Sequence, residues 1–442
     1  MIVLFSMNLL NYVDRYVFYA VGEEISKDLG FDDLQFGYLS SSFMVVYTAV
    51  SPVVGYLGDR WSRKRLLAFG VGLWSFATVG TAFAGLLTGR NFSEMFFWRA
   101  LLGVGEASYG ILAPTLLADL FQPRTRARVV GLFYLALPMG GAIGYALGGI
   151  IGHQFGWRSA FLIVGFPGLI ASISALFIRD PGRGASEGEA DARTDRSGVI
   201  DYLDCFRNRT FVFNTAGLAA VTFTTGVYAV YGAKFFQRVH GLGLHQAGIR
   251  ISITTLAAGL LGILLGIWLP DFLRKFTPSA YLLWAALACM LSAPLGMLGL
   301  LARDTNVALI LLFGAIVLLA SVLGPCNAVT ADVVPARRRA AGYALSIFLL
   351  HLFGDIASPP LIGWVSIRFG SEPLVRSRMG RWLAENGHGA IQAADGTLTN
   401  LTVGMLMLVP MLALGGLFFW IGSRSLPSDL VGTKVPGNKP IH

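Results

Sequence analysis

Charged residues are scarce in this chain. They make up only 13% of its 442 residues, whereas 55% are apolar and 12% are aromatic. Soluble globular domains carry about 25% charged residues, because their surfaces must be solvated. The scarcity therefore excludes an ordinary water-soluble protein and predicts that the chain lies in a lipid bilayer.

Cysteine and histidine are also rare. The three cysteines, Cys205, Cys289 and Cys326, are scattered and show no paired spacing for a metal site or a disulfide framework. The six histidines lie mostly in predicted loops, and no serine motif is present. An integral-membrane enzyme would need a nucleophile with a base, or clustered metal ligands, at one depth. The sequence argues against such an enzyme and predicts no cofactor and no metal.

The N-terminus lacks the features of a removable signal peptide. Its apolar segment has no basic leader and no small-residue cleavage site, and it contains the polar residues Asn8, Asn11, Asp14 and Arg15. We expect this segment to be a true first membrane helix.

Long apolar windows predict the fold. A helix needs about 20 apolar residues to cross about 30 Å of hydrocarbon, and twelve windows are long and apolar enough. They predict an all-α integral membrane protein with twelve transmembrane helices. The windows begin at Met1, Leu34, Leu66, Phe92, Arg128, Trp157, Phe211, Gln246, Ser279, Thr305, Arg338 and Asn400.

The clearest change of composition separates six windows from six. Small and charged residues dominate 179–209, which predicts a flexible linker. Near its end, Val199, Leu203 and Phe206 fall on one side of a short helix that would lie on the membrane surface; a solvated loop is the alternative. The predicted units are an N-terminal bundle (1–178), the linker (179–210), a C-terminal bundle (211–423) and a tail (424–442).

The formal net charge is +9, which on a soluble protein would suggest a nucleic-acid partner. Here the basic residues follow the membrane topology. If Met1 is cytoplasmic, the loops on that side and the C-terminal tail hold most of the lysines and arginines. We therefore predict an inner-membrane protein without a nucleic-acid partner, with both termini cytoplasmic and with the long loop 371–400 outside.

An arginine and a glutamate lie deep inside the fourth window. Glu106 follows Arg99 by seven residues, so the two share one helix face. A charge near the bilayer centre costs roughly 2.5–3.5 kcal/mol on insertion scales, so such residues usually face a protein interior or a wet cavity and mark an ion or substrate path. This face predicts the working surface of a membrane transporter.

In the first window, Asp14 and Arg15 reach a similar depth, because a helix rises 1.5 Å per residue. We expect Asp14 to meet Arg99, which leaves Glu106 as the acid free to take up a proton. Either arginine can bind an anionic headgroup bidentately. The alternative is a closed ionic cluster of the four side chains that only locks two helices together.

The second half carries fewer intramembrane charges. His351 and Asp355 share one face of the eleventh window at i, i+4, and they either contact a substrate or only bond to each other. Without a third ligand the pair is too small for a metal site. Lys234 lies near the outer end of the seventh window, where it either contacts the substrate or snorkels to the interface.

Two loops predict an internal repeat and a gate. Residues 55–65 read G-Y-L-G-D-R-W-S-R-K-R and residues 266–275 read G-I-W-L-P-D-F-L-R-K, as expected of a transporter built from two related halves. The glycine allows close helix approach, and the acid can bind helix N-termini and arginines across an inner gate. A loop that only sets topology is the alternative. The predicted gate residues are Gly55, Asp59, Arg60, Arg63, Asp271 and Arg274.

In the fifth window, Gly140, Gly144 and Gly148 recur every four residues. Small residues at this spacing predict a tight packing seam between two helices.

The loop 55–65 and the fifth-window glycines resemble signature motifs of the major facilitator superfamily. The sequences N-Y-V-D-R-Y from Asn11, R-A-L-L-G-V-G-E-A-S-Y from Arg99, G-P-C-N-A-V from Gly324 and H-L-F-G-D-I-A-S-P-P-L-I-G from His351 are together similar to the Spinster family, which includes sphingolipid and lysophospholipid transporters. The chain departs from the superfamily pattern at Phe272, where an arginine commonly follows the acid, and this departure weakens the second half of the predicted gate.

The resemblance implies a major facilitator fold of two pseudo-symmetric six-helix bundles. It also implies a proton-coupled transporter that works as a monomer by alternating access on an amphiphilic substrate of lysophospholipid or sphingoid phosphate type. Glu106 and Asp14 would be the proton-coupling acids. A proton-linked organic-anion or drug transporter and an uncoupled uniporter are the alternatives, and a receptor that has lost transport is disfavoured by the intramembrane charges. The predicted substrate contacts are Asn11, Arg15, Arg99, Tyr109, Lys234, His351 and Asp355.

Overall fold

The computed structural model describes residues 1–121, 123–178, 180, 204–335, 339–393 and 395–430. Nearly all of its regular structure is helical. Two strands of two residues each, β1 (Ile391–Gln392) and β2 (Leu398–Thr399), pair antiparallel in the loop 371–400, with Ile391 opposite Thr399. The predicted all-α class is confirmed.

The twelve predicted spans correspond to twelve helical passages. Ten stretches of the described residues are long and apolar enough to cross a membrane, and two more polar helices of 19 residues, α1 and α4, run beside them. The first half contains α1 (Ile2–Ala20), α2 (Gly22–Leu29), α3 (Asp33–Arg60), α4 (Arg63–Thr81), α5 (Asn91–Leu120), α6 (Pro123–Tyr134), α7 (Ala136–Phe155) and α8 (Trp157–Ala175).

The second half begins at Arg209, and several of its passages are broken into two helices. It contains α10 (Arg209–Arg238), α11 (Leu244–Leu273), α12 (Ala280–Leu301), α13 (Thr305–Ala320), α14 (Leu323–Val333), α15 (Arg339–Phe353), α16 (Ser358–Gly370), α19 (Leu401–Leu406) and α20 (Leu408–Asp429). The short helices α17 (Glu372–Val375) and α18 (Arg378–Glu385) belong to the loop 371–400, which we call the lobe.

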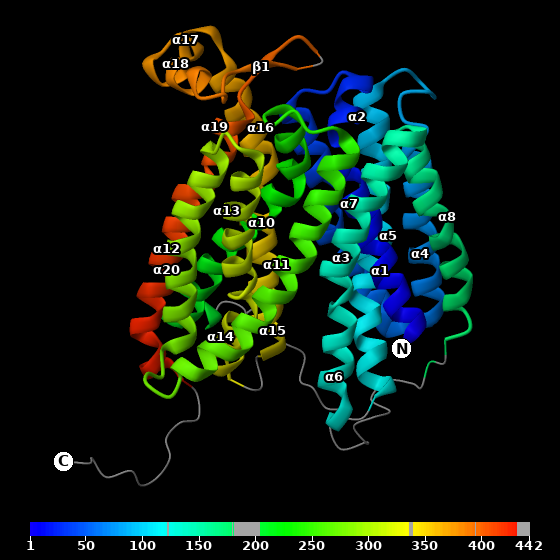
Figure 1. The fold of residues 1–442 in the computed structure, drawn as a ribbon. Coiled ribbons are helices and arrows are strands. Elements are labelled where there is room, and N and C mark those ends of the chain that lie inside the picture. The colour runs from blue at the N-terminus through cyan, green and yellow to red at the C-terminus, as the bar shows by residue number, and fades with distance from the viewer. Residues whose placement is uncertain (122, 179, 181–203, 336–338, 394, 431–442) are drawn as a thin grey trace, which may run out of the picture.

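The two halves stand side by side as separate bundles (Figure 1). Helix α1 begins, and α20 ends, on the side that we call the terminal side; the lobe projects from the opposite side, which we call the lobe side. Most of the predicted linker lies outside the described residues, Val199 and Leu203 included. Phe206 is described and is exposed, and α20 continues past the predicted limit at 423.

Polar side chains fix where several helices begin. Asp32 accepts a hydrogen bond from the Gln35 backbone N–H at 2.6 Å, and the Gln35 side chain accepts one from the Asp32 N–H, which forms a capping box at the start of α3. Asn208 caps α10 and Asp304 caps α13 by accepting from the backbone N–H three residues on. These caps fix the helix ends on both sides of the membrane.

The predicted glycine seam joins α7 to α1. A Cβ atom added at Gly144 would lie 2.7 Å from the Cβ of Tyr16, and one added at Gly148 would lie 2.6 Å from the Cβ of Ala20. Gly140 is equally close to Tyr12. Larger side chains would push α7 away from α1, so the prediction of tight packing is confirmed.

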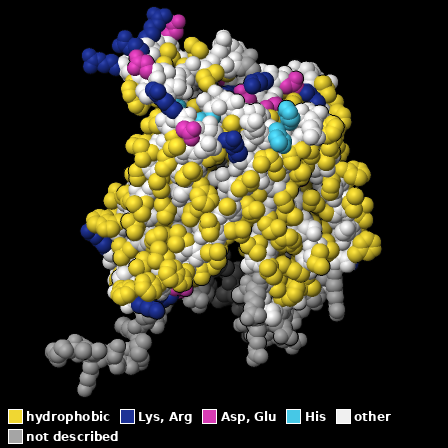
Figure 2. Space-filling model, viewed as in Figure 1, with side chains coloured by type: hydrophobic (Ala, Val, Ile, Leu, Met, Phe, Trp, Pro, Cys, Tyr) yellow, Lys and Arg dark blue, Asp and Glu magenta, His cyan; other side chains and the backbone are white. Residues whose placement is uncertain are grey.

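The two bundles meet on the lobe side and separate on the terminal side. Helix α3 packs against α16, and α7 packs against α11. In the α7–α11 contact, Gly149 and Gly248 bring two backbones together: a Cβ on Gly248 would lie 2.8 Å from the Gly149 Cα. Figure 2 shows a notch between the bundles at the terminal side. The structure is therefore closed towards the lobe side and open towards the terminal side.

Candidate functional site

Four predicted charges on α1 and α5 lie inside the first bundle. Asp14, Arg99 and Glu106 are each 1–2% exposed, and the Arg15 side chain is 18% exposed. Helix α5 reaches this position because it packs between α3 and α4. Burial of a charge is costly unless its polar atoms find partners.

The ion pair in this cluster differs from the predicted one. Arg15 Nη2 donates to Glu106 Oε2 at 2.5 Å, whereas Asp14 and Arg99 form no ion pair among the described residues. Successive side chains on a helix point about 100° apart. Asp14 consequently faces α4, where the Thr78 hydroxyl donates to its Oδ2 at 3.2 Å, while Arg15 faces α5.

Arg99 is held by aromatic rings rather than by an acid. Its guanidinium lies 4.1 Å from the centre of the Phe18 ring and 4.8 Å from that of Phe43, and its Nε donates to the Leu39 carbonyl at 3.4 Å. The faces of aromatic rings attract cations through their quadrupole. Arg99 can thus remain charged in the interior while Glu106 pairs with Arg15.

The two carboxylate oxygens of Glu106 have different surroundings. Its Oε1 is buried and has no hydrogen-bond partner among the described residues, and its side chain is 1% exposed. The expected pairing of Asp14 with Arg99 is thus replaced by a pairing of Arg15 with Glu106, and the role of Glu106 as a proton carrier stays a prediction. Oε1 of Glu106 is therefore available for a proton. That proton would weaken the buried ion pair between Glu106 and Arg15.

Two predicted substrate contacts in the first bundle have different surroundings. The Tyr109 hydroxyl donates to the Leu4 carbonyl at 2.6 Å, and its ring packs edge-on against Trp74. Tyr109 is 2% exposed and therefore joins α5 to α1 instead of lining a cavity. Asn11 is also buried, and its side-chain nitrogen has no partner among the residues described.

In the second bundle, His351 and Asp355 bond to each other. His351 Nδ1 lies 2.9 Å from Asp355 Oδ1, and the two side chains are 26% and 24% exposed. Asp355 packs against Gly226 of α10. The pair is thus partly exposed, on α15 and the segment that follows it. Among the described residues, no group of three or more histidine, cysteine and acidic side chains forms a metal site.

Lys234 lies at the contact between the bundles, where its side chain is 0% exposed, so it does not snorkel to the surface. Its Nζ donates to the Ser26 hydroxyl at 2.8 Å, lies 3.5 Å from Asp33 Oδ1 and stands 4.0 Å from the centre of the Phe36 ring. All three of these partners belong to the other bundle.

Arg238 completes a cluster that the sequence analysis missed. Its Nε donates to Glu23 Oε2 at 2.6 Å and its Nη1 donates to Asp33 Oδ1 at 2.8 Å, while the Ser366 hydroxyl donates to Asp33 Oδ2 at 2.9 Å. We call this cluster the lobe-side seal; its members are Glu23, Ser26, Asp33, Tyr231, Lys234, Arg238 and Ser366.

A sequence signal for the seal exists on α10. Tyr231, Lys234 and Arg238 are spaced i, i+3 and i+7, so they lie on one helix face. The Tyr231 hydroxyl lies 2.8 Å from the Asp33 carbonyl oxygen and 2.9 Å from that of Pro359. Their partners in α2 and α3 are about 200 positions away in the chain, and nothing in the local sequence identifies them.

On the terminal side, the predicted gate residues pair within their own bundles. Arg63 binds Asp119 of the first bundle at 2.5 Å and Asp180, which directly follows that bundle, at 2.7 Å. Arg60 is exposed and stacks on Tyr56. A Cβ atom added at Gly55 would meet no atom of another described segment within 4 Å. The side chain of Asp59 lies outside the described part of the structure.

The second-bundle gate residues behave in the same way. The Tyr281 hydroxyl donates to Asp271 Oδ1 at 2.5 Å, and Arg274 Nη1 donates to the Tyr281 oxygen at 3.3 Å. Asp271 and Arg274 are thus joined through a tyrosine of α12, within the second bundle.

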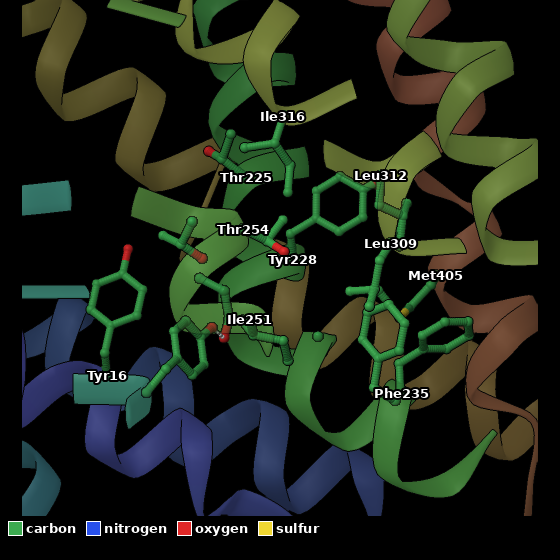
Figure 3. A pocket seen from close by; sticks show the side chains of 15 residues that line it. Tyr16, Thr225, Tyr228, Phe235, Ile251, Thr254, Leu309, Leu312, Ile316 and Met405 are labelled. Carbon is green, nitrogen blue, oxygen red and sulfur yellow. Dashed lines mark hydrogen bonds between the residues drawn. The ribbon is translucent and has the colours of Figure 1, made fainter. Parts of the chain in front are cut away.

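An apolar cavity of about 150 Å³ lies mainly in the second bundle, with Tyr16 and Tyr145 lining it from the first. In Figure 3, Tyr16 of α1 lies on one side of it, and Tyr228, Leu309 and Leu312 lie on the other. The Tyr145 hydroxyl closes the first-bundle side by donating to the Ala229 carbonyl at 2.5 Å. Typical small-molecule pockets measure roughly 300–1,000 Å³, so this cavity admits an apolar chain segment rather than a whole ligand.

A second, polar pocket of about 350 Å³ lies between the lobe and the lobe-side ends of α10 and α12. His240 and His388 line it. Burial lowers the pKa of His388, and Arg303 lowers it further. Burial also lowers the pKa of His240, with a contribution from His388. Both imidazoles are therefore neutral over a wider pH range than free histidine.

The sequence matches the family model described as Major Facilitator Superfamily over residues 4–359. It is also 34% identical over 398 residues to Protein spinster homolog 1 of Xenopus tropicalis, covering 84% of this chain and 74% of that protein. This chain belongs to the Spinster family of the major facilitator superfamily. The superfamily consists of transporters, so this Spinster-family chain is a transporter and not an enzyme.

Other Spinster proteins and solved structures agree. Protein spinster of Drosophila melanogaster is 35% identical over 382 residues, covering 82% of this chain and 61% of that protein. The crystal structure of a bacterial homologue of the human lysosomal transporter Spinster, inward-facing and unoccupied, matches with a TM-score of 0.80 at 22% identity over 97% of both chains. A D-xylose–proton symporter matches with a TM-score of 0.70 at 18% identity, over 95% of this chain and 96% of that one. These structural matches establish the twelve-helix major facilitator fold.

Proposed function

We propose that this Spinster-family protein is a proton-coupled transporter of an amphiphilic anion and that Glu106 is its proton-coupling acid. The observation that carries the proposal is the buried pair of Arg15 and Glu106. Glu106 has one oxygen bound to Arg15 and one oxygen without a partner among the described residues, and the Arg15 side chain is the more exposed of the two.

A proton on Glu106 changes what Arg15 can bind. Protonation neutralises the carboxylate and removes most of its attraction to the guanidinium. Arg15 is then free for a phosphate or carboxylate headgroup, which matches a guanidinium in charge and geometry. Asp14, bonded to Thr78, is the second acid of the site. Loss of the proton would restore the Arg15–Glu106 pair and release the headgroup.

The apolar cavity supports an amphiphilic substrate. Tyr16 follows Arg15 in α1 and lines the cavity, and on this proposal a headgroup at Arg15 extends an apolar chain past Tyr16 towards Tyr228 and Leu312. A lysophospholipid or a sphingoid phosphate has this form. A small organic anion would use Arg15 without the cavity, and an uncoupled uniporter would use both without Glu106.

We further propose that the protein acts as a monomer in the inner membrane, with the terminal side in the cytoplasm. The positive charge of the terminal-side loops supports this orientation. Cysteine labelling in intact cells tests it: Met379→Cys, in the lobe, should react with an impermeant maleimide, and Ser186→Cys, in the linker, should not. The reverse pattern would invert the topology.

Uptake into proteoliposomes tests the coupled function. An imposed pH gradient should accelerate uptake of a radiolabelled lysophospholipid, and a protonophore should abolish the acceleration. If the pH gradient does not change the uptake of the same lipid, the protein is better described as a uniporter. A response to an organic anion without an acyl chain, but not to the lipid, would favour the organic-anion alternative.

A further inference from the structure

In the lobe-side seal, the two bundles contribute charges of opposite sign. Its acids, Glu23 and Asp33, come from the first bundle, and its bases, Lys234 and Arg238, come from the second. Asp33 and Lys234 have fully buried side chains, and Arg238 is 7% exposed. The acids and bases must part whenever the lobe side opens, because they belong to different bundles.

We propose that Lys234 and Arg238 form an anion-binding station for the substrate headgroup in the state that is open towards the lobe side. In the present state, the carboxylates of Glu23 and Asp33 occupy this station. The proposal rests on transport by alternating access. It assigns Lys234 and Arg238 a second binding partner, the substrate headgroup, in the other conformation.

The physical reason is the cost of leaving buried charges unpaired. Removing one partner of a buried ion pair is strongly destabilising, because the remaining charge is uncompensated. When the bundles separate, Lys234 and Arg238 stay together on α10 while the carboxylates leave with α2 and α3. A phosphate or carboxylate headgroup offers the same oxygen acceptors and can replace both acids.

The apolar cavity continues from this station. Phe235 and Phe236 directly follow Lys234 and line the cavity, as does Tyr228 on the same helix. From 228 to 234, α10 rises about 9 Å. A single-chain amphiphile can therefore place an anionic headgroup at Lys234 and Arg238 and its apolar chain in the cavity. The same chain compartment would then serve both the station and Arg15.

Arg15 provides an internal contrast. Its carboxylate partner, Glu106, belongs to the same bundle, so movement of one bundle against the other does not separate them. Protonation must release Arg15, whereas opening of the lobe side releases Lys234 and Arg238. The two cationic sites are thus controlled by different events.

Distance measurements between spin labels test the station. Labels at Leu87→Cys and Val307→Cys, which are 62% and 47% exposed, report the lobe side; labels at Phe177→Cys and Phe276→Cys, which are 83% and 74% exposed, report the terminal side. The three native cysteines are buried. With the seal residues unchanged, dodecyl phosphate should increase the fraction of molecules that have a long distance between the lobe-side labels. Dodecyltrimethylammonium should not.

Matched substitutions separate a station from a mere seal. Glu23→Gln with Asp33→Asn should open the lobe side without ligand and bind dodecyl phosphate at least about tenfold more tightly, because no carboxylates compete for the bases. Lys234→Met with Arg238→Gln should also open the lobe side, yet bind dodecyl phosphate at least about tenfold more weakly than the acid variant. Lys234→Arg, which keeps the charge, should retain binding.

Equal dodecyl phosphate affinity in the acid and base variants would overturn the station and leave a mere seal. If the double base variant does not fold, Lys234→Met alone, compared with Lys234→Arg, decides the same question. Displacement of dodecyl phosphate by millimolar inorganic phosphate would show that the headgroup alone is recognised. None of these measurements needs a pH gradient, so they remain informative even if transport by this protein is not proton-coupled.

Discussion

The lobe side and the terminal side of this protein pair their charges in opposite ways. On the lobe side, Arg238 and Lys234 bind acids of the other bundle. On the terminal side, Arg63 binds acids of its own bundle, and Asp271 reaches Arg274 through Tyr281 of the same bundle. The ion pairs between the bundles keep the lobe side closed. The ion pairs within a bundle keep that bundle rigid while it moves.

The difference explains which side is open. As far as the described residues show, the hydrogen bonds and ion pairs between the bundles lie in the lobe-side half of the helices, from Tyr145 and Ala229 outward. The terminal-side pairs do not oppose separation of the bundles. Which side of this protein is open therefore depends on which charges pair across the two bundles, and less on how many charges each side carries.

Reversing one charge of the lobe-side seal should have the largest effect on the difference between the two sides. Arg238→Glu places a third acid beside Glu23 and Asp33, and loss of a buried pair costs about 3 kcal/mol or more, a population change of about 100-fold. The lobe-side spin-label distance between Leu87 and Val307 should lengthen. Arg381→Glu, the same change at an exposed lobe residue, should leave the distance unaltered. An unchanged distance in Arg238→Glu would show that other contacts close this side.

Removing a terminal-side base should lower stability without changing the conformation. Arg63→Ala leaves Asp119 and Asp180 without this base; because both acids are partly exposed, we expect a loss of about 2 kcal/mol. Thermal unfolding should begin at a lower temperature, while the lobe-side distance stays the same. Arg65→Ala, at an exposed residue two positions on, is the control. A lengthened lobe-side distance in Arg63→Ala would contradict the separation of roles.

Removing one hydroxyl should weaken the seal slightly. Tyr231→Phe removes the single hydroxyl hydrogen that is shared between the Asp33 and Pro359 carbonyls, a bond worth about 0.5–1.5 kcal/mol. The open fraction of the lobe side should rise by about fivefold. Tyr228→Phe is the matched control, because the Tyr228 hydroxyl has no partner among the described residues. Equal behaviour of the two variants would mean that the Tyr231 hydroxyl does not contribute.

The smallest effect should come from pH on the lobe. Burial lowers the pKa of His388 and of His240, so the unfolded chain binds protons at a higher pH than the folded lobe does. The stability that these neutral imidazoles contribute is complete above about pH 6.5 and is lost as the pH falls below that value. Protection of the 371–400 amides from hydrogen exchange, relative to the intrinsic exchange rate at each pH, should fall below pH 6, and His388→Gln should reduce the change.

Much of the fold follows from the sequence, because each span needs only length, apolarity and a capping or breaking residue. The glycines at 140, 144 and 148 predicted a tight packing seam on α7, since spacing along one helix determines one face, but the partner helix, α1, is known only from the structure. The pairing inside the site was less predictable. Asp14 and Arg15 are neighbours, and a rotation of about 100° decides which of them meets α5.

The lobe-side seal shows why contacts between distant segments stay hidden. Lys234 was expected to touch substrate or to snorkel, and Glu23 and Asp33 were not singled out. Nothing local distinguishes an acid that binds a base about 200 residues later from an acid that faces water. Only the packing of α2 and α3 against α10 brings these charges together.

Transport by Glu106→Gln tests the proposed coupling most directly. The substitution keeps the size of the side chain but cannot exchange a proton, and Glu372→Gln at the exposed lobe pair with Arg376 is the matched control. In proteoliposomes, Glu106→Gln should still exchange labelled for unlabelled lysophospholipid, because exchange needs no net proton movement. It should fail to accumulate the lipid when a pH gradient is imposed, whereas Glu372→Gln should behave as the unsubstituted protein. Full gradient-driven accumulation by Glu106→Gln would contradict the account and shift the proton site to Asp14.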